Sequence, residues 1–129
     1  MREAEVKRKI IESVREDGGY ARRIEDKFTV GMPDIVLIPV QCPVVWLEVK
    51  LVASQVFHPS MRQLVELMKL RRAPHSTSFV VGWKRGLLYI SQPKKDIPLD
   101  DCIEQKTGES VTRLIKRAIE YEQQQTNSS

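Results

Sequence analysis

Cysteine and histidine are scarce in this chain. The two cysteines, Cys42 and Cys102, do not belong to a CxxC or comparable cluster, which argues against a structural zinc site and against a disulfide scaffold. The two histidines, His58 and His75, are isolated in the sequence. An isolated histidine is more often a surface or core residue than a metal ligand. The sequence therefore offers no cysteine- or histidine-based metal motif.

Long apolar runs are also missing. No run approaches the length needed to cross a bilayer, and the first residues, MREAEVKRK, lack the apolar stretch of a signal peptide. The length of 129 residues, with 41% hydrophobic and 29% charged residues, is ordinary for one globular domain. We therefore expect a cytoplasmic protein with no membrane partner, a single domain over residues 1–122 and a disordered Gln/Asn/Ser-rich tail over 123–129.

The charge balance is mildly basic. A formal net charge of +4 and a pI near 9.2 fit a polyanionic partner such as DNA. An excess of this size is common among proteins that never bind nucleic acid, so it favours that class only slightly.

Hydrophobic periodicity predicts three helices. Apolar residues recur at helical spacing over residues 3–16, and Gly18-Gly19 stops the pattern. A second helix is predicted over 60–73, with Ser60 as a possible N-cap and Pro74 beyond its end. A third begins near Val111, where an apolar stripe extends to Ile119.

Short β-branched and aromatic segments predict the strands. They cover residues 20–30 (as a strand or a hairpin), 35–39, 44–51, 78–83 and 86–91. The resulting order is α-β-β-β-α-β-β-α, which indicates an α/β fold with a mixed central sheet flanked by helices.

One predicted hairpin carries the most informative residues. If the segments 35–38 and 44–49 pair antiparallel around Gln41, Asp34 lies opposite Glu48, with Cβ atoms roughly 5 Å apart. Lys50 follows two residues after Glu48 and therefore projects from the same side of the strand. Two carboxylates at this distance repel each other, and their apolar neighbours suggest burial. A divalent cation removes that cost, because Mg²⁺ and Mn²⁺ are bound by hard oxygen ligands.

The first helix offers a third carboxylate. With Val6 at the origin of a helical wheel of about 100° per residue, Ile10, Glu3 and Val14 fall within the same narrow sector. Glu5 lies far outside it. A glutamate on an apolar stripe is out of place unless it points at something positive, so Glu3 is a candidate metal or water ligand.

Together these residues resemble the PD-(D/E)xK nuclease superfamily. The match rests on Glu3, the Gly-x-Pro-Asp at 31–34, the Glu-x-Lys at 48–50 and a helical glutamine, and it covers about residues 3–90. It is strongest with the VRR-NUC branch and its short stand-alone phage and bacterial members. The resemblance implies a restriction-endonuclease-like core and, for a phage protein, location in the host cytoplasm.

The resemblance also implies roles for individual residues. Asp34, Glu48, the Val49 carbonyl and Glu3 would bind Mg²⁺ or Mn²⁺, and Lys50 would orient or activate the attacking water. Gln63 matches the glutamine of the branch, although the spacer from Lys50 is longer than usual and Gln55 is a rival.

Basic residues near these motifs are candidate DNA contacts. They are Arg22, Arg23 and Lys27 before the hairpin, and Lys84 and Arg85 at a predicted turn between strands. Each cluster can equally be a solvated surface, and nothing in the chain resembles a sequence-reading module.

The first functional hypothesis is a homodimeric, Mg²⁺- or Mn²⁺-dependent endonuclease of the Holliday-junction-resolvase type, acting on branched DNA. One alternative is another nuclease, a nickase or an exonuclease, in phage replication or packaging. Another is a non-catalytic DNA-binding protein that keeps the fold.

Overall fold

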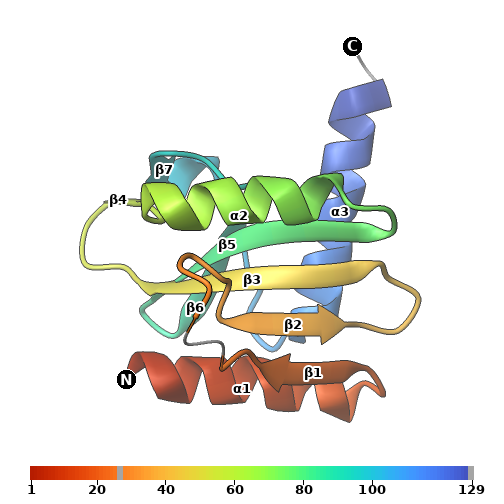
Figure 1. The fold of residues 1–129 in the computed structure, drawn as a ribbon. Helices are drawn as coiled ribbons and strands as arrows, with labels where there is room; N and C mark the ends of the chain where they lie inside the picture. The colour runs from red at the N-terminus through yellow and green to blue at the C-terminus, as the bar shows by residue number, and fades with distance from the viewer. Residues whose placement is uncertain (26–27, 128–129) are drawn as a thin grey trace.

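The structure is a computed structural model, and it describes residues 1–25 and 28–127 (Figure 1). Its regular elements in chain order are α1 (Glu3–Glu16), β1 (Tyr20–Arg23), β2 (Ile35–Ile38), β3 (Val44–Leu51), β4 (Val56–Phe57), α2 (Met61–Arg72), β5 (Ser76–Lys84), β6 (Leu87–Ser91), β7 (Ile97–Pro98), the 3₁₀ turn η1 (Leu99–Asp101), β8 (Ile103–Glu104) and α3 (Val111–Asn127).

The main sheet is mixed, as the element order predicted. Its six strands lie in the order β1-β2-β3-β5-β6-β8. Strands β3 and β5 are parallel, because the chain crosses through α2 between them, and the other neighbours are antiparallel. Strands β4 and β7 form a separate two-stranded ribbon.

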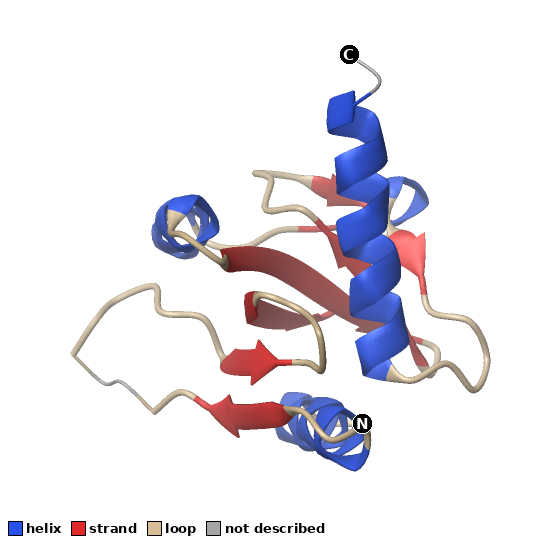
Figure 2. Ribbon diagram, turned by 90° about the vertical axis from the view of Figure 1, so that its right-hand side faces the viewer, coloured by secondary structure: helices blue, strands red, loops and turns tan. Residues whose placement is uncertain are grey.

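The sheet buries apolar side chains on both faces. Alternate residues of β3 and β5, among them Leu47 and Phe79, pack with Ile10 of α1 and Ile115 of α3. Val80 points to the opposite face and joins the smaller core around Leu67 of α2. Figure 2 accordingly shows α2 on the opposite side of the sheet from α3. Helices thus flank both faces of the sheet.

The long elements match the sequence-based expectations closely. The first helix spans the predicted residues, and Ser60 is the N-cap of α2. The two-residue strands β4, β7 and β8 and the turn η1 were not predicted, because segments this short carry no periodicity. No helix in the described part of the chain is long and apolar enough to span a bilayer.

The C-terminal end differs from the expectation of disorder from residue 123. Helix α3 continues to Asn127. The Arg71 guanidinium binds both carboxylate oxygens of Glu122, at 2.6 and 2.7 Å, and Thr126 Oγ1 donates to the Glu122 carbonyl at 3.1 Å. The first of these contacts ties α3 to α2 at Glu122, one residue before the segment expected to be disordered.

Candidate active site

The β2–β3 hairpin has the register that a loop centred on Gln41 predicts. Ile35 pairs with Leu47, Val36 with Trp46, and Leu37 with Val45. Asp34 immediately precedes β2, and its Oδ2 accepts a hydrogen bond from the Val49 backbone N–H at 2.8 Å. The Asp34 carboxylate therefore continues the hairpin by one step, beside Glu48.

The glycine of the Gly-x-Pro-Asp motif is required for steric reasons. Gly31 has φ of +90°, and a Cβ there would lie 2.6 Å from the Arg62 carbonyl oxygen and 3.1 Å from the Gln63 nitrogen. The loop into Asp34 thus passes directly against the first turn of α2. Only glycine combines this conformation with this approach, and the result is that the start of α2 lies next to the hairpin.

Glu48 is the buried acid of the group, with 2% of its surface exposed. Its Oε2 accepts from Gln63 Nε2 at 2.8 Å and lies 3.4 Å from Lys50 Nζ. Its Oε1 is also buried and has no hydrogen-bond partner among the described residues. A buried carboxylate oxygen without a partner is costly.

The pKa of Glu48 also reflects its burial with too few hydrogen-bond partners. Burial, and after it the neighbouring Asp34 carboxylate, raise the pKa of Glu48 to about 8, although Lys50 acts in the opposite direction. Without a further positive charge, Glu48 therefore holds a proton at neutral pH.

Gln63 connects α2 to this acid. It forms a capping box with Ser60, in which Gln63 Oε1 accepts from the Ser60 N–H at 2.8 Å and Ser60 Oγ accepts from the Gln63 N–H at 3.1 Å. Gln63 Oε1 also accepts from Lys50 Nζ at 3.0 Å. The rival Gln55 lies elsewhere, with its carbonyl bonded to the Leu99 N–H. Gln63 is therefore the glutamine beside Glu48 and Lys50.

Lys7 is a site residue that the sequence reasoning missed. Its Nζ lies 3.0 Å from Asp34 Oδ1 and 3.2 Å from Glu3 Oε1. Burial lowers the pKa of Lys7, but hydrogen bonds and attraction from Asp34 and Glu3 outweigh this and raise it. The signal was present, because Lys7 falls at about 100° on the wheel, beside the apolar stripe that contains Glu3. Glu3 points at a positive group, which is Lys7.

A metal ligand set is only partly assembled. Among the described residues, no three His, Cys, Asp or Glu side chains are grouped so that they could hold an ion, and the third candidate acid, Glu3, pairs with Lys7. The unpartnered Glu48 oxygen and the adjacent Asp34 are nevertheless hard oxygen donors of the kind that Mg²⁺ and Mn²⁺ require. The Val49 carbonyl points to the same side of β3 as its N–H, toward Asp34. These residues fit a small divalent cation.

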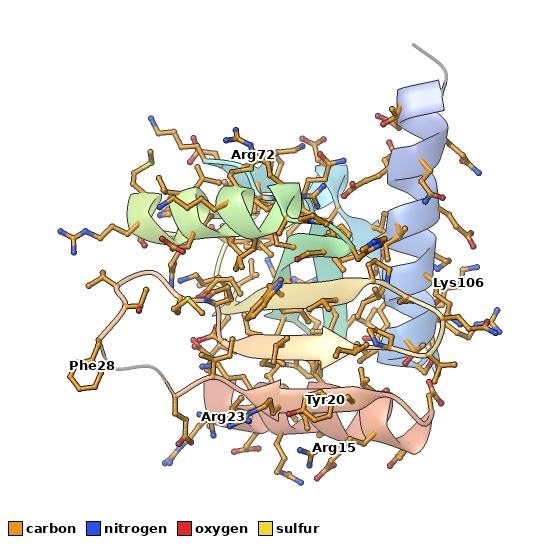
Figure 3. All side chains as sticks on the ribbon, turned by 45° about the vertical axis from the view of Figure 1, so that its right-hand side comes forward. Arg15, Tyr20, Arg23, Phe28, Arg72 and Lys106 are labelled. Carbon is orange, nitrogen blue, oxygen red and sulfur yellow. The ribbon has the colours of Figure 1, made fainter. Side chains whose placement is uncertain are left out.

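The predicted basic residues lie at the same end of the sheet. Arg23 is opposite Ile35, the residue after Asp34, and Arg22 is opposite Val36. Both are exposed on the edge strand, and Figure 3 labels Arg23 there. Lys84 ends β5 and donates to the Ser54 carbonyl at 3.0 Å, and Arg85 follows in the turn. Because β3 and β5 are parallel, this turn lies near Lys50. Lys27 lies outside the described residues.

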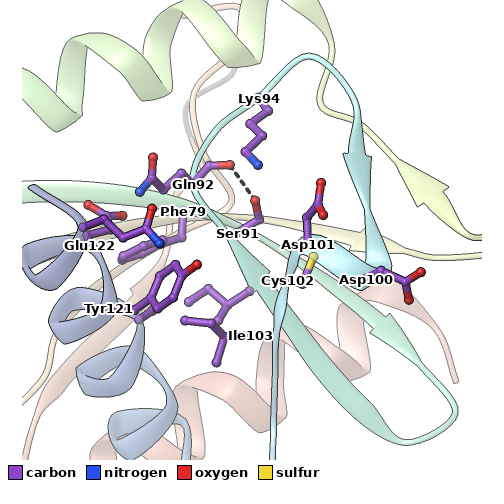
Figure 4. Close-up of a pocket in the computed structure, with 13 residues that line it drawn as sticks. Phe79, Ser91, Gln92, Lys94, Asp100, Asp101, Cys102, Ile103, Tyr121 and Glu122 are labelled. Atoms are coloured by element: carbon purple, nitrogen blue, oxygen red, sulfur yellow. Dashed lines mark hydrogen bonds between the residues drawn. The ribbon is translucent and has the colours of Figure 1, made fainter. Parts of the chain in front are cut away.

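A separate pocket of about 480 Å³ opens between β6, η1 and α3 (Figure 4). Phe79 and Ile90 form part of its apolar floor, and Lys94, Asp101 and Tyr121 lie around it. Burial raises the pKa of the adjoining Cys102 thiol to about 11, which makes it a poor nucleophile. None of the predicted site residues is among those that line this pocket.

Comparison with known proteins identifies the fold. No protein-family model matches the chain, and no curated protein matches its sequence significantly. The structure is similar to that of Hjc, a Holliday junction resolvase from the archaeal hyperthermophile Archaeoglobus fulgidus, with a TM-score of 0.58 and 16% sequence identity. The match covers 75% of this chain and 82% of that chain. This confirms the expected restriction-endonuclease-like α/β fold, and at this identity it shows the fold alone; membership of the VRR-NUC branch stays a prediction.

Proposed function

We propose that this protein is a metal-dependent endonuclease that hydrolyses DNA phosphodiester bonds at branched structures, in the manner of a Holliday junction resolvase. The support is a group of two carboxylates and a lysine, Asp34, Glu48 and Lys50, held by contacts between a hairpin and a helix. The fold that holds them is also that of a resolvase.

The observation that carries the proposal is the state of Glu48. A buried acid with one unpartnered oxygen and a pKa near 8 destabilises the fold. A chain selected only for stability would avoid it. The cost is understandable if Glu48 and Asp34, with the Val49 carbonyl and Glu3, hold a divalent cation. Such a cation, Mg²⁺ or Mn²⁺, would neutralise charge on a phosphate and lower the pKa of a water.

The residues around the acids orient the reacting groups. The Val49 N–H fixes one oxygen of Asp34, and Gln63 fixes both Glu48 and the Lys50 ammonium. Lys50 is partly exposed, so its ammonium can meet a phosphate oxygen and stabilise the negative charge that develops during hydrolysis. Gln63 is a positioning residue in this scheme, because it acts through its two neighbours.

The basic residues at this end of the sheet provide the DNA surface. Arg22 and Arg23 on β1, together with Lys84 at the end of β5 and Arg85 after it, would contact phosphates on either side of the site. Lys27 is a further candidate. Cutting two opposed strands of a junction requires two sites, so we propose that the active form is a homodimer.

The test is cleavage of a labelled four-way junction and a matched linear duplex in Mg²⁺ or Mn²⁺. The wild type should cut the junction, and Asp34→Ala should lower the rate by at least about 10³-fold, the scale expected when a central charged group is lost. Asp17→Ala is the matched control, since Asp17 is an exposed acid at the far end of α1. Identical products from the wild type and Asp34→Ala would refute the enzymatic proposal.

The other outcomes separate the related functions. Equal cleavage of junction and linear duplex would indicate a general nuclease, and stepwise release of nucleotides would indicate an exonuclease. Tight junction binding with no cleavage in either metal would indicate a DNA-binding protein. Light scattering at micromolar concentration tests the dimer, and a monomer there would contradict the resolvase arrangement.

A further inference from the structure

Two lysines contact the acids of the candidate site, and each contacts a different member of the Asp34–Glu48 pair. Lys50 lies 3.4 Å from Glu48 Oε2, and Lys7 lies 3.0 Å from Asp34 Oδ1. The pairs come from different elements, because Lys50 shares β3 with its acid while Lys7 reaches Asp34 from α1. The scheme above uses Lys50 and leaves Lys7 without a role.

The position of Lys7 is enclosed and specific. Its side chain is only 13% exposed, and its ammonium bridges Asp34 and Glu3. Both oxygens of Asp34 are thereby engaged, since Oδ2 accepts from the Val49 N–H. A cation that binds Oδ1 therefore displaces Lys7 or shares this oxygen with a second positive charge. The same contact keeps Glu3 turned toward Lys7.

We infer that Lys7 is a resident counter-ion of the site, which holds Asp34 and Glu3 in place before a divalent cation binds and competes with that cation for them. This inference rests on the proposed metal-dependent function and names a residue that regulates its metal affinity. An ammonium group neutralises the acids of the metal-free protein and lowers their affinity for a second positive charge. Lys7 thus stabilises the site in the metal-free protein and weakens the binding of the divalent cation.

This role predicts opposite effects of one substitution. Replacing Lys7 by methionine keeps the apolar length of the side chain and removes the ammonium. In EDTA, Lys7→Met should melt lower than the wild type, by about 3 °C, because Asp34 and Glu3 lose the charge that neutralises them. In isothermal titration with Mn²⁺ at pH 7.5, the same variant should bind roughly tenfold more tightly, about 1.4 kcal/mol. A purely structural lysine would lower the melting temperature without tightening Mn²⁺ binding.

Two further variants make the comparison decisive. Lys9→Met removes an exposed lysine from the same helix, and it should change neither quantity. Lys7→Arg keeps a positive charge at the position, and it should retain weak Mn²⁺ binding close to that of the wild type. Lys7→Arg also tests the inference if Lys7→Met does not fold. An arginine variant that binds Mn²⁺ tenfold more tightly than the wild type would overturn the inference.

The outcomes separate this inference from the proposed function. If the wild type binds Mn²⁺ and Asp34→Ala does not, while Lys7→Met binds equally or more weakly, the counter-ion role is wrong and the metal site stands. If neither the wild type nor Lys7→Met binds Mn²⁺, both the metal site and the counter-ion role are wrong.

Discussion

Each end of α2 contacts a glutamate from another element, Glu48 of β3 at its start and Glu122 of α3 at its end, and the two contacts differ. At its start, Gln63 binds Glu48, which keeps an unpartnered buried oxygen and a raised pKa. At its end, Arg71 binds both oxygens of Glu122 and also donates to the Ser78 carbonyl. The Arg71 guanidinium lies over the Phe79 ring, 5.1 Å from its centroid. Both ends join the helix to another element of the fold.

The two glutamates differ in how many of their carboxylate oxygens have hydrogen-bond partners. A forked guanidinium engages both oxygens of a carboxylate in a fixed geometry, so Glu122 needs no further partner. Among the described residues at this end of α2, the Arg71 Nε alone is buried without an acceptor. At the other end, the Gln63 amide and the Lys50 ammonium both contact Oε2 of Glu48, and Oε1 has no hydrogen-bond partner among the described residues. The first arrangement fits a structural tie, and the second fits a site that awaits a ligand.

The largest effect expected from this difference concerns pH. The pKa of Glu48 is about 8 in the folded protein, against an ordinary value of 4.5 for a solvated glutamate. Its contribution to stability is therefore fully present below about 4.5 and is lost as pH rises through about 8. In EDTA, the unfolding free energy of Glu48→Gln relative to the wild type should rise by on the order of 3 kcal/mol between pH 5.5 and pH 8.5.

Urea unfolding at several pH values measures this difference. Glu16→Gln is the matched control, because Glu16 is an exposed acid at the end of α1. A Glu48→Gln difference that stays constant with pH would mean that Glu48 remains ionised when folded, and the contrast between the two ends of α2 would disappear.

The second effect is the loss of the closed pair. Glu122→Gln leaves the Arg71 guanidinium without its counter-charge. Breaking a fully buried pair costs more, but both side chains here are about one fifth exposed, so we expect destabilisation of about 2 kcal/mol. Urea unfolding measures it, with Glu120→Gln on the exposed face of α3 as control. Junction cleavage should stay within about twofold of the wild type at 25 °C. A stable variant with impaired cleavage would show that Glu122 serves the site.

The sequence was most informative where local geometry decides. A tight loop around Gln41 sets the register of the β2–β3 hairpin, so the proximity of Asp34 and Glu48 could be predicted. The position of Ser60 followed from N-cap preference alone.

Contacts between distant elements escaped prediction. The pairing of Lys7 with Asp34 depends on how α1 lies against the sheet. The contact of α3 with α2 joins Glu122 to Arg71, 51 positions before it. Neither contact is encoded in a local sequence pattern, although the position of Lys7 on the helical wheel indicated that it lies beside Glu3.

The smallest effect tests how far the start of α2 serves the fold as well as the site. Ser60→Ala removes the hydroxyl that accepts from the Gln63 N–H, and loss of such a cap costs about 1 kcal/mol. Gln63 keeps its bonds to Glu48 and Lys50, so cleavage should fall by less than about tenfold. Ser60→Thr retains the hydroxyl and is the control in both urea unfolding and cleavage. If Ser60→Ala leaves stability unchanged but lowers cleavage by about a hundredfold, the hydroxyl contacts the substrate, and the start of α2 belongs to the DNA surface more than to the fold.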